Sequence, residues 1–365
     1  MKTEAALTLT HKEFLKVERD LKMAASTVHL LYVSDRQPGI SRNKKGKGFS
    51  YRLNNRVVRD RDQLTRIRKL VIPPAWTNVW ICPDERGHIQ ATGLDLRKRK
   101  QYRYHPLWNS LRNETKFHLL YEFGKALPLL RSRVEQDLQI RDLTQEKVLA
   151  TVISLMEKTL IRVGNQEYER ANGSYGLTTL KNKHVSISGD RVKFSFKGKK
   201  GIHHDITIQN RRLARIIAQC HDIPGKELFE YYEEDGSRHS VDSGMVNSYI
   251  RAATGGDFSA KIFRTWAGSL HALTEFHNAS EALTATEIKK TVNSVLDCVS
   301  SKLGNTRTVC RKYYVHPGLI RLYEENKLAK YLHELNKMDN DEGDHPGLTA
   351  GEKVLMKILR QYITT

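Results

Sequence analysis

A tyrosine among cations near the C-terminal end of the chain is the first feature that could do chemistry. Residues 304–317 read GNTRTVCRKYYVHP, so that Arg311 and Lys312 directly precede Tyr313 and Tyr314. A phenol ionises at about pH 10, and a tyrosine that attacks a phosphodiester therefore needs positive charge or hydrogen-bond donors nearby. The segment indicates a nucleophile directed at phosphate, although a solvated basic helix face with one packed ring would show the same residues.

Two arginines in apolar surroundings could supply the positive charge. Arg162 lies in the stretch LIRVGN at 160–165, which we expect to be helical. An unpaired guanidinium is costly to bury, so Arg162 should face a cleft; the alternative is a structural ion pair with Glu157 or Glu167. Arg264 follows Lys261 by three residues, so that both would share one helix face. Two guanidiniums on one phosphate would stabilise the extra negative charge of a pentacoordinate phosphorus.

A lysine at a predicted hairpin tip completes the candidate chemistry. Lys199 lies between glycines in the sequence KGKKG at 197–201. Glycines let the backbone approach a ligand closely and let a loop move, so Lys199 could deliver a proton. A solvated charged turn is the alternative.

Composition points to a polyanionic partner. The 365 residues include 61 Lys and Arg against 41 Asp and Glu, a net charge of +20. Such a surplus favours nucleic acid, or less well an anionic membrane surface. The sequence has no apolar run near the roughly 18–20 residues of a spanning helix and no signal-peptide pattern. We therefore expect a soluble cytoplasmic protein, nucleoid-associated if bacterial.

Cysteine and histidine spacing argues against a metal or disulfide framework. The four cysteines are far apart, and His203–His204 is the only adjacent histidine pair. Neither pattern has the spacing of a structural zinc site. We expect no metal, and no P-loop points to a nucleotide cofactor.

The charge and the predicted elements divide the chain in two. Residues 1–108 hold 23 of the Lys and Arg but only 10 of the Asp and Glu. Alternating runs at 78–82, 88–92 and 101–105 predict a hairpin followed by a third strand. We expect residues 1–108 to form a basic α+β domain, mainly antiparallel, that provides much of the binding to nucleic acid.

The remainder, residues 109–365, is predicted to be a largely helical catalytic domain within an overall α+β fold. Helical periods cover 117–127, 144–171, 211–221 and 287–303. Alternation at 185–188, 191–196 and 202–208 predicts a three-stranded β meander with Lys199 between its last two strands. An acidic loop at 339–345 precedes a short last helix.

Several ordered motifs resemble the type IB DNA topoisomerases of the compact bacterial and poxviral kind. The motifs are IRVGN at 161–165, YGLTTLKNKH at 175–184, FKGK at 196–199, FRTW at 263–266 and CRKYY at 310–314. Upstream, IPPAW at 72–76 and KQYRYHP at 100–106 resemble the N-terminal domain of that family. The resemblance spans nearly the whole chain.

The resemblance implies a role for each candidate. Tyr314 matches the nucleophile that forms a 3′-phosphotyrosyl bond and releases a 5′-hydroxyl strand. Arg162 and Arg264 match the clamps on the transition state, and Lys199 matches the general acid for the departing 5′ oxygen. Asn305 falls where the family has His or Asn donating to a nonbridging oxygen.

Two parts of the resemblance are less direct. Lys261 matches an auxiliary cation, but Ile262 follows it where the family commonly has Asp, which leaves the orientation of the lysine open. The DNA-contacting positions of the N-terminal domain would be Arg99, Lys100, Gln101, Tyr102 and Tyr104. A basic edge strand with aromatic packing is their alternative.

The resemblance implies a monomer whose two lobes close as a C-shaped clamp around double-stranded DNA. It would nick one strand, let the free end rotate, and reseal, relaxing positive and negative supercoils without ATP or a required metal. A tyrosine recombinase is an alternative, although recombinases usually carry His-x-x-Arg where this chain has Lys261 and Arg264. A non-catalytic DNA-binding protein is the second alternative.

Overall fold

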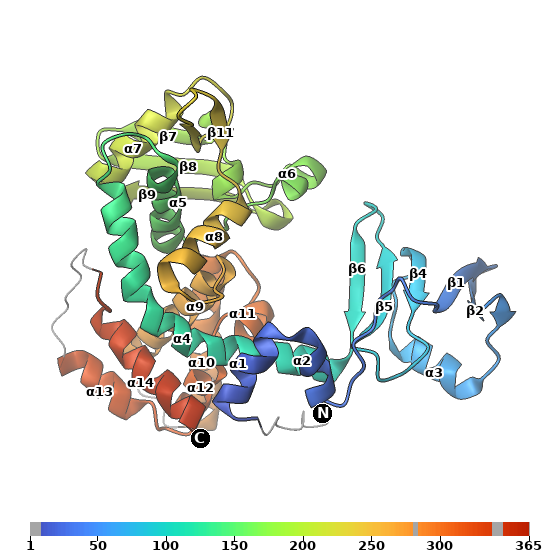
Figure 1. Ribbon diagram of the computed structural model, residues 1–365. Coiled ribbons are helices and arrows are strands. Elements are labelled where there is room, and N and C mark those ends of the chain that lie inside the picture. Colours follow the sequence, from blue (N-terminus) through green and yellow to red (C-terminus); the bar gives the residue numbers. More distant parts are fainter. Residues whose placement is uncertain (1–8, 280–283, 338–345, 365) are drawn as a thin grey trace. The chain divides into compact units, whose positions relative to one another are not determined.

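The computed structural model describes residues 9–279, 284–337 and 346–364 (Figure 1). The chain forms two compact units, Met1–Leu119 and Leu120–Thr365. The long helix α4 (Pro106–Leu138) spans the division between them. The mixture of helices and antiparallel sheets confirms the predicted α+β fold class. No helix in the described ranges combines the length and hydrophobicity needed to cross a bilayer.

The first unit is built on a six-stranded antiparallel sheet of order β3-β2-β1-β4-β5-β6. The strands are β1 (Ile40–Lys45), β2 (Gly48–Leu53), β3 (Arg56–Val57), β4 (Thr77–Ile81), β5 (Ile89–Leu94) and β6 (Lys100–Tyr104). The predicted strands β4, β5 and β6 are confirmed, while β1 to β3 were not expected. Helix α3 (Arg61–Lys69) places Ile67 in the core against Ile40 and Ile81. Helices α1 (His11–Arg19) and α2 (Leu21–Thr27) form a second small core with α4.

Arg42 explains why the IPPAW segment has a fixed shape. This β1 residue donates to the carbonyl oxygens of Ile72 (3.2 Å), Pro73 (3.0 Å) and Trp76 (2.7 Å). Prolines cannot donate backbone hydrogen bonds, so the loop depends on an outside donor for its carbonyls. The loop is thereby held against the start of β1.

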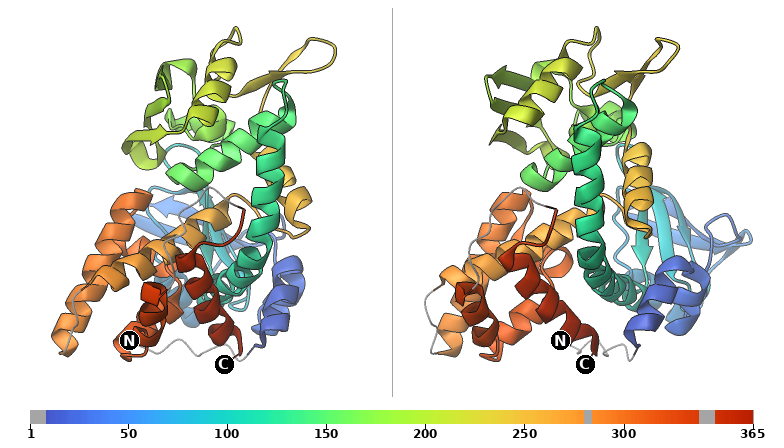
Figure 2. Two further views of the ribbon diagram at one scale, coloured as in Figure 1. Left: turned by 90° about the vertical axis from the view of Figure 1, so that its left-hand side faces the viewer. Right: turned by 60° about the vertical axis from the view of Figure 1, so that its left-hand side comes forward.

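The second unit surrounds one buried helix, α5 (Gln145–Thr159). Eleven of its fifteen residues are buried, as expected for a helix that packs on all sides. In Figure 2 the sheet β7–β9 lies toward one end of α4 and the red C-terminal helices toward the other. The remaining helices are α6 (Gln166–Asn172), α7 (Arg211–His221), α8 (Ser243–Thr254), α9 (Lys261–Asn278), α10 (Ala285–Leu303), α11 (Arg307–Tyr313), α12 (Pro317–Glu324), α13 (Ala329–Lys337) and α14 (Ala350–Thr364).

The predicted meander is confirmed as an antiparallel sheet. Its strands are β7 (Val185–Ser188), β8 (Arg191–Lys197) and β9 (His203–Gln209), with the short 3₁₀ turn η3 (Lys199–Gly201) between the last two. A second hairpin, β10 (Glu230–Tyr232) and β11 (Arg238–Ser240), was not expected. The short last helix is α14, whereas the acidic loop at 339–345 lies outside the described residues.

The expected helix over 144–171 is wrong, because it breaks between α5 and α6. Leu160 adopts a left-handed conformation (φ 57°, ψ 15°), and Gly164 also has positive φ. The carbonyl of Arg162 accepts from Leu177 N (2.9 Å) and that of Val163 from Thr178 N (2.7 Å). These contacts replace helical hydrogen bonds, so Arg162 lies in an extended loop.

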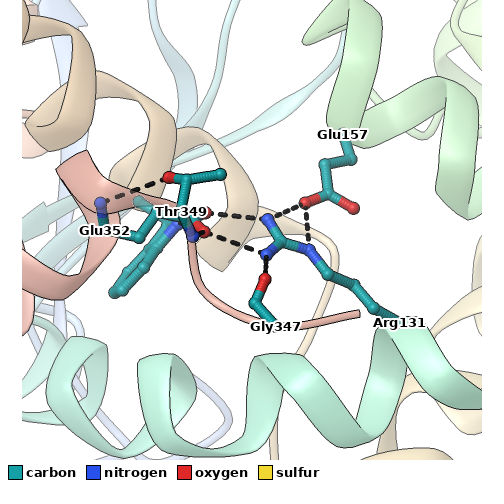
Figure 3. A network of polar contacts seen from close by, with 6 residues as sticks. Arg131, Glu157, Gly347, Thr349 and Glu352 are labelled. Carbon is teal, nitrogen blue, oxygen red and sulfur yellow. Dashed lines mark hydrogen bonds and ion pairs between the residues drawn. The ribbon is translucent and has the colours of Figure 1, made fainter. Parts of the chain in front are cut away.

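A buried ion-pair network joins four helices of the second unit (Figure 3). Arg131 of α4 donates to Glu352 of α14 (2.7 and 2.9 Å) and to Glu157 of α5 (Nε, 2.8 Å). Glu352 also accepts from the indole of Trp266 on α9 at 3.0 Å. The C-terminal helix is thus tied to α9, the helix that carries Lys261 and Arg264.

Candidate active site

Arg264 is the fixed centre of the candidate site. It projects from α9 and is only 7% exposed. Its guanidinium donates to the carbonyl of Leu160 at 2.5 Å and to the carbonyl of Leu303. Leu160 is the C-cap of α5 and Leu303 ends α10, so both carbonyls belong to helix ends that lack intrahelical donors. A cation is favoured there because helix C-termini carry partial negative charge.

Arg162 is brought next to Asn305. Its Nη2 donates to Asn305 Oδ1 at 3.2 Å, while Asn305 Nδ2 donates to the carbonyl of Leu303 at 3.2 Å. Glu157 pairs with Arg131 instead, and Arg162 has no carboxylate partner in the part of the chain that the structure describes. No carboxylate therefore neutralises the positive charge of Arg162, which can interact with a bound anion.

Tyr314 directly follows α11 and is half-buried. Its ring centroid lies 5.3 Å from the guanidinium carbon of Arg264. Gly268 of α9 lets the two segments touch, since a Cβ there would stand 2.7 Å from the Tyr314 carbonyl oxygen. Ser269 Oγ donates to that carbonyl at 3.3 Å and accepts from the backbone N of His316 at 3.0 Å. Helix α9 thus fixes the backbone on both sides of the tyrosine.

Lys199 projects from η3, the turn between β8 and β9. Lys200 and Gly201, with φ of 63° and 78°, adopt the left-handed conformations that close this turn. A small cavity is lined by Arg162, Lys199, His204, Arg264 and Lys302. The turn therefore brings the lysine to the same place as the two arginines.

Comparison with known proteins identifies the family. Residues 99–341 match the catalytic core of eukaryotic DNA topoisomerase I, and residues 48–95 match the N-terminal domain of bacterial DNA topoisomerase IB. DNA topoisomerase 1B of Acanthamoeba polyphaga mimivirus is 34% identical over 297 residues, covering 79% of this chain and 88% of the relative. The chain belongs to the type IB DNA topoisomerase family.

Two poxvirus proteins show the same relationship at lower identity. DNA topoisomerase 1B of vaccinia virus is 27% identical over 139 residues, which cover 38% of this chain and 44% of the relative. DNA topoisomerase 1 of rabbit fibroma virus is 22% identical over 248 residues, which cover 67% of this chain and 75% of the relative. The resemblance to type IB topoisomerases drawn from the short motifs is confirmed.

The cations of this topoisomerase site are close enough to perturb one another. Burial lowers the pKa of Arg162 and the charge of Arg264 lowers it further, whereas the nearby Tyr314 acts in the opposite direction. Much of the Lys199 side chain is exposed, yet desolvation lowers the pKa of its ammonium, and the charge of Arg162 adds to the effect. Cations that repel one another without a carboxylate between them form a site suited to an anion.

Lys261 and its neighbour Ile262 differ in exposure. Lys261 is exposed at the start of α9, and its charge contributes to the lowered pKa of Lys199. Ile262 is buried, with 6% exposed, on the core face of the same helix. An unpaired carboxylate would be costly at that depth, so the isoleucine suits the position that it occupies here.

The N-terminal candidates lie on or beside β6, the edge strand of the first unit. Arg99 pairs with Asp95 at 2.7 Å and Lys100 with Asp35 at 2.6 Å, while Gln101 donates to Asp95 at 3.0 Å. The exposed rings of Tyr102 and Tyr104 stack with centroids 5.7 Å apart. Both features of the alternative interpretation, an edge strand and aromatic packing, are therefore present. The two stacked rings are also exposed at the surface.

The adjacent histidines His203 and His204 both belong to strand β9. Neighbouring residues of a strand point to opposite faces, so His203 and His204 on β9 cannot hold one ion together. Among the described residues, no three His, Cys, Asp or Glu side chains gather as a metal site requires. No role was predicted for His204, Gly268 or Ser269, although the motifs FKGK and FRTW lie close to them in the sequence.

Proposed function

We propose that this chain relaxes positive and negative DNA supercoils by cutting and rejoining one strand through a 3′-phosphotyrosyl bond to Tyr314. The observation that carries the assignment is the position of Tyr314 beside the guanidinium of Arg264 and near that of Arg162. Its ring centroid lies 5.3 Å from the guanidinium carbon of Arg264, and Tyr314 is close enough to Arg162 to affect the pKa of the arginine. Donors fixed before the reaction are the arrangement that most strongly stabilises developing negative charge.

In the cleavage step the Tyr314 oxygen forms a bond to the scissile phosphorus and the bond from phosphorus to the 5′ oxygen breaks. The phenol proton passes to solvent water, and Lys199 supplies a proton to the departing 5′ oxygen. Arg162, Arg264 and Asn305 donate to the nonbridging oxygens, with Lys261 as an auxiliary cation. Since the phosphotyrosyl bond conserves the phosphodiester energy, the 5′ hydroxyl reverses the step after the strand has rotated.

Double-stranded DNA is the substrate, and we propose two contact surfaces on the first unit. The first is the β6 region, with Arg99, Lys100, Gln101, Tyr102 and Tyr104. The second is the β1–β3 surface, whose exposed cations have no ion pair within the described ranges: Lys44, Lys45, Lys47, Arg52 and Arg56. Cations without carboxylate partners lose little when they bind phosphate. We further propose that the protein acts as a monomer in the cytoplasm.

The test is relaxation of plasmids of both supercoil signs in EDTA without ATP. We expect wild type to relax both and Tyr314→Phe to relax neither while still binding DNA. Tyr313→Phe is the matched control, because Tyr313 is exposed at 41% and should leave relaxation intact. Relaxation by Tyr314→Phe, or its loss in Tyr313→Phe with Tyr314 present, would refute the assignment of the nucleophile.

A further inference from the structure

His204 lies at the candidate site but takes no part in the proposed cleavage step. It lines the cavity together with Arg162, Lys199 and Arg264. Its neighbour His203 points to the other face of β9, where it lies 3.2 Å from Ser195 Oγ and 3.1 Å from Asp205. The two adjacent histidines therefore differ in environment, and only His204 reaches the cations.

The imidazole of His204 supports the turn that carries Lys199. It pairs across the hairpin with Phe196, and the two rings stack with centroids 5.2 Å apart and an interplanar angle of 22°. A Cβ on Gly198 would stand 2.5 Å from His204 Cδ2 and 2.6 Å from Nε2. The ring thus lies directly against the backbone of the residue before Lys199.

The same ring also approaches the loop that carries Asn305. A Cβ on Gly304 would stand 3.2 Å from His204 Cε1. His204 therefore lies between two glycines, each of which immediately precedes a proposed site residue. Burial, followed by the charges of Arg162 and Arg264, lowers the pKa of His204, so the imidazole stays neutral at neutral pH.

We propose that His204 is a positioning residue that holds the η3 turn so that Lys199 reaches the departing 5′ oxygen. This inference rests on the proposed function of Lys199. The turn is short and contains the left-handed residues Lys200 and Gly201, and its first residue has no side-chain cap. Proton transfer requires the heavy atoms to approach within about 2.6–3.2 Å, and a displacement of about 1 Å can cost 10²-fold in rate. Two backbone hydrogen bonds close the turn, from Gly198 N to the carbonyl of Ile202 (2.7 Å) and from Gly201 N to that of Gly198 (3.1 Å), and the stack of Phe196 and His204 adds side-chain support at its base.

The experiment measures single-turnover cleavage of two DNA duplexes that differ at the scissile phosphate. One has the ordinary bridging 5′ oxygen and the other a bridging 5′ sulfur, whose thiol ionises near pH 8.5 and leaves without a proton. We expect His204→Ala to cleave the oxygen substrate about 10- to 100-fold more slowly than wild type. On the sulfur substrate it should come within a few-fold of wild type.

Control variants separate the role of His204 from other defects. His203→Ala, one residue away on the opposite face, should match wild type on both substrates. His204→Phe keeps a ring on Phe196 and should restore most of the cleavage of the oxygen substrate. An unchanged rate for His204→Ala, an equal loss on both substrates, or no recovery in His204→Phe would overturn the inference.

One further variant tests the underlying assignment separately. Lys199→Ala should be slow on the oxygen substrate and recover on the sulfur substrate. If Lys199→Ala does not recover, the general acid is another group and the proposed role of Lys199 fails. If Lys199→Ala recovers and His204→Ala does not, the positioning role of His204 fails alone. Equal DNA binding by all variants shows that each is folded.

Discussion

Replacing Glu352 by Gln should destabilise the second unit substantially. Glu352 is 2% exposed, accepts twice from Arg131, and accepts from Trp266 and from the backbone N of Thr349. Removing one charge of a buried ion pair costs about 3–5 kcal/mol. Since Glu157 remains beside Arg131, we expect a loss near the lower end, about 3 kcal/mol in the free energy of unfolding.

The loss of stability in Glu352→Gln should become smaller as the pH falls. Burial by itself would raise the pKa of Glu352, but the hydrogen bonds and charge of Arg131 outweigh it, and the net pKa lies below the ordinary 4.5. A carboxyl group with a lowered pKa in the folded state contributes stability above its unfolded pKa, which is lost as the pH falls through the folded value. The difference between wild type and Glu352→Gln should therefore be full at pH 7 and shrink below about pH 4.5.

The assay is urea unfolding followed by far-ultraviolet circular dichroism at pH 7 and at pH 4. Glu334→Gln is the matched control, because its ion pair with Lys357 also involves α14 but has side chains 52% and 40% exposed. An exposed pair contributes at most about 1 kcal/mol. A loss below about 1 kcal/mol for Glu352→Gln at pH 7, or a loss that grows in acid, would refute the role given to the network.

Two further predictions concern the nucleophile and the DNA-binding surface. Gly268→Ala should slow single-turnover cleavage about tenfold or more with DNA binding unchanged, because the Cβ of the alanine would stand 2.7 Å from the Tyr314 carbonyl oxygen. Cleavage at the wild-type rate would show that α9 does not fix the tyrosine. Changing three unpaired lysines of the β1–β2 hairpin to Gln should make the salt dependence of DNA binding shallower, by about 0.9 in log–log slope for each phosphate that the protein no longer neutralises. An unchanged slope would argue against this surface. The hairpin variants are at Lys44, Lys45 and Lys47, and the control changes are at Lys125, Lys327 and Lys357, which already pair with carboxylates.

The elements predicted correctly are those whose formation depends on residues close together in the sequence. Alternation in β8 and β9 reflects one buried face, with Val192, Phe194 and Phe196 all buried, so the meander was visible in the sequence. The helical spacing of Lys261 and Arg264 was likewise sufficient to place both on α9. These features need only nearest neighbours along the chain.

Features that depend on distant contacts were not predictable in the same way. The apolar residues around Arg162 favour a continued helix, whereas hydrogen bonds from the distant Leu177 and Thr178 to the loop carbonyls hold the segment in an extended loop. Strand β1 was missed because its sequence, ISRNKK, has a single apolar residue, whereas the alternating Phe49, Tyr51 and Leu53 of β2 do indicate a strand and were overlooked. His204 was noticed only as one of an adjacent histidine pair, because the role proposed for it depends on the distant glycine at 304 as well as on Gly198.

The two hydrogen bonds of Arg264 to helix-end carbonyls affect the order in which residues of this site can be lost in evolution. One side chain both serves the proposed chemistry and satisfies the terminal carbonyls of two helices, through Leu160 and Leu303. A mutation that removes it would leave buried acceptors unpaired, at a cost of about 1–3 kcal/mol each. Inactive descendants that keep this fold should therefore retain the arginine longer than Tyr314, and its presence alone is a poor marker of activity.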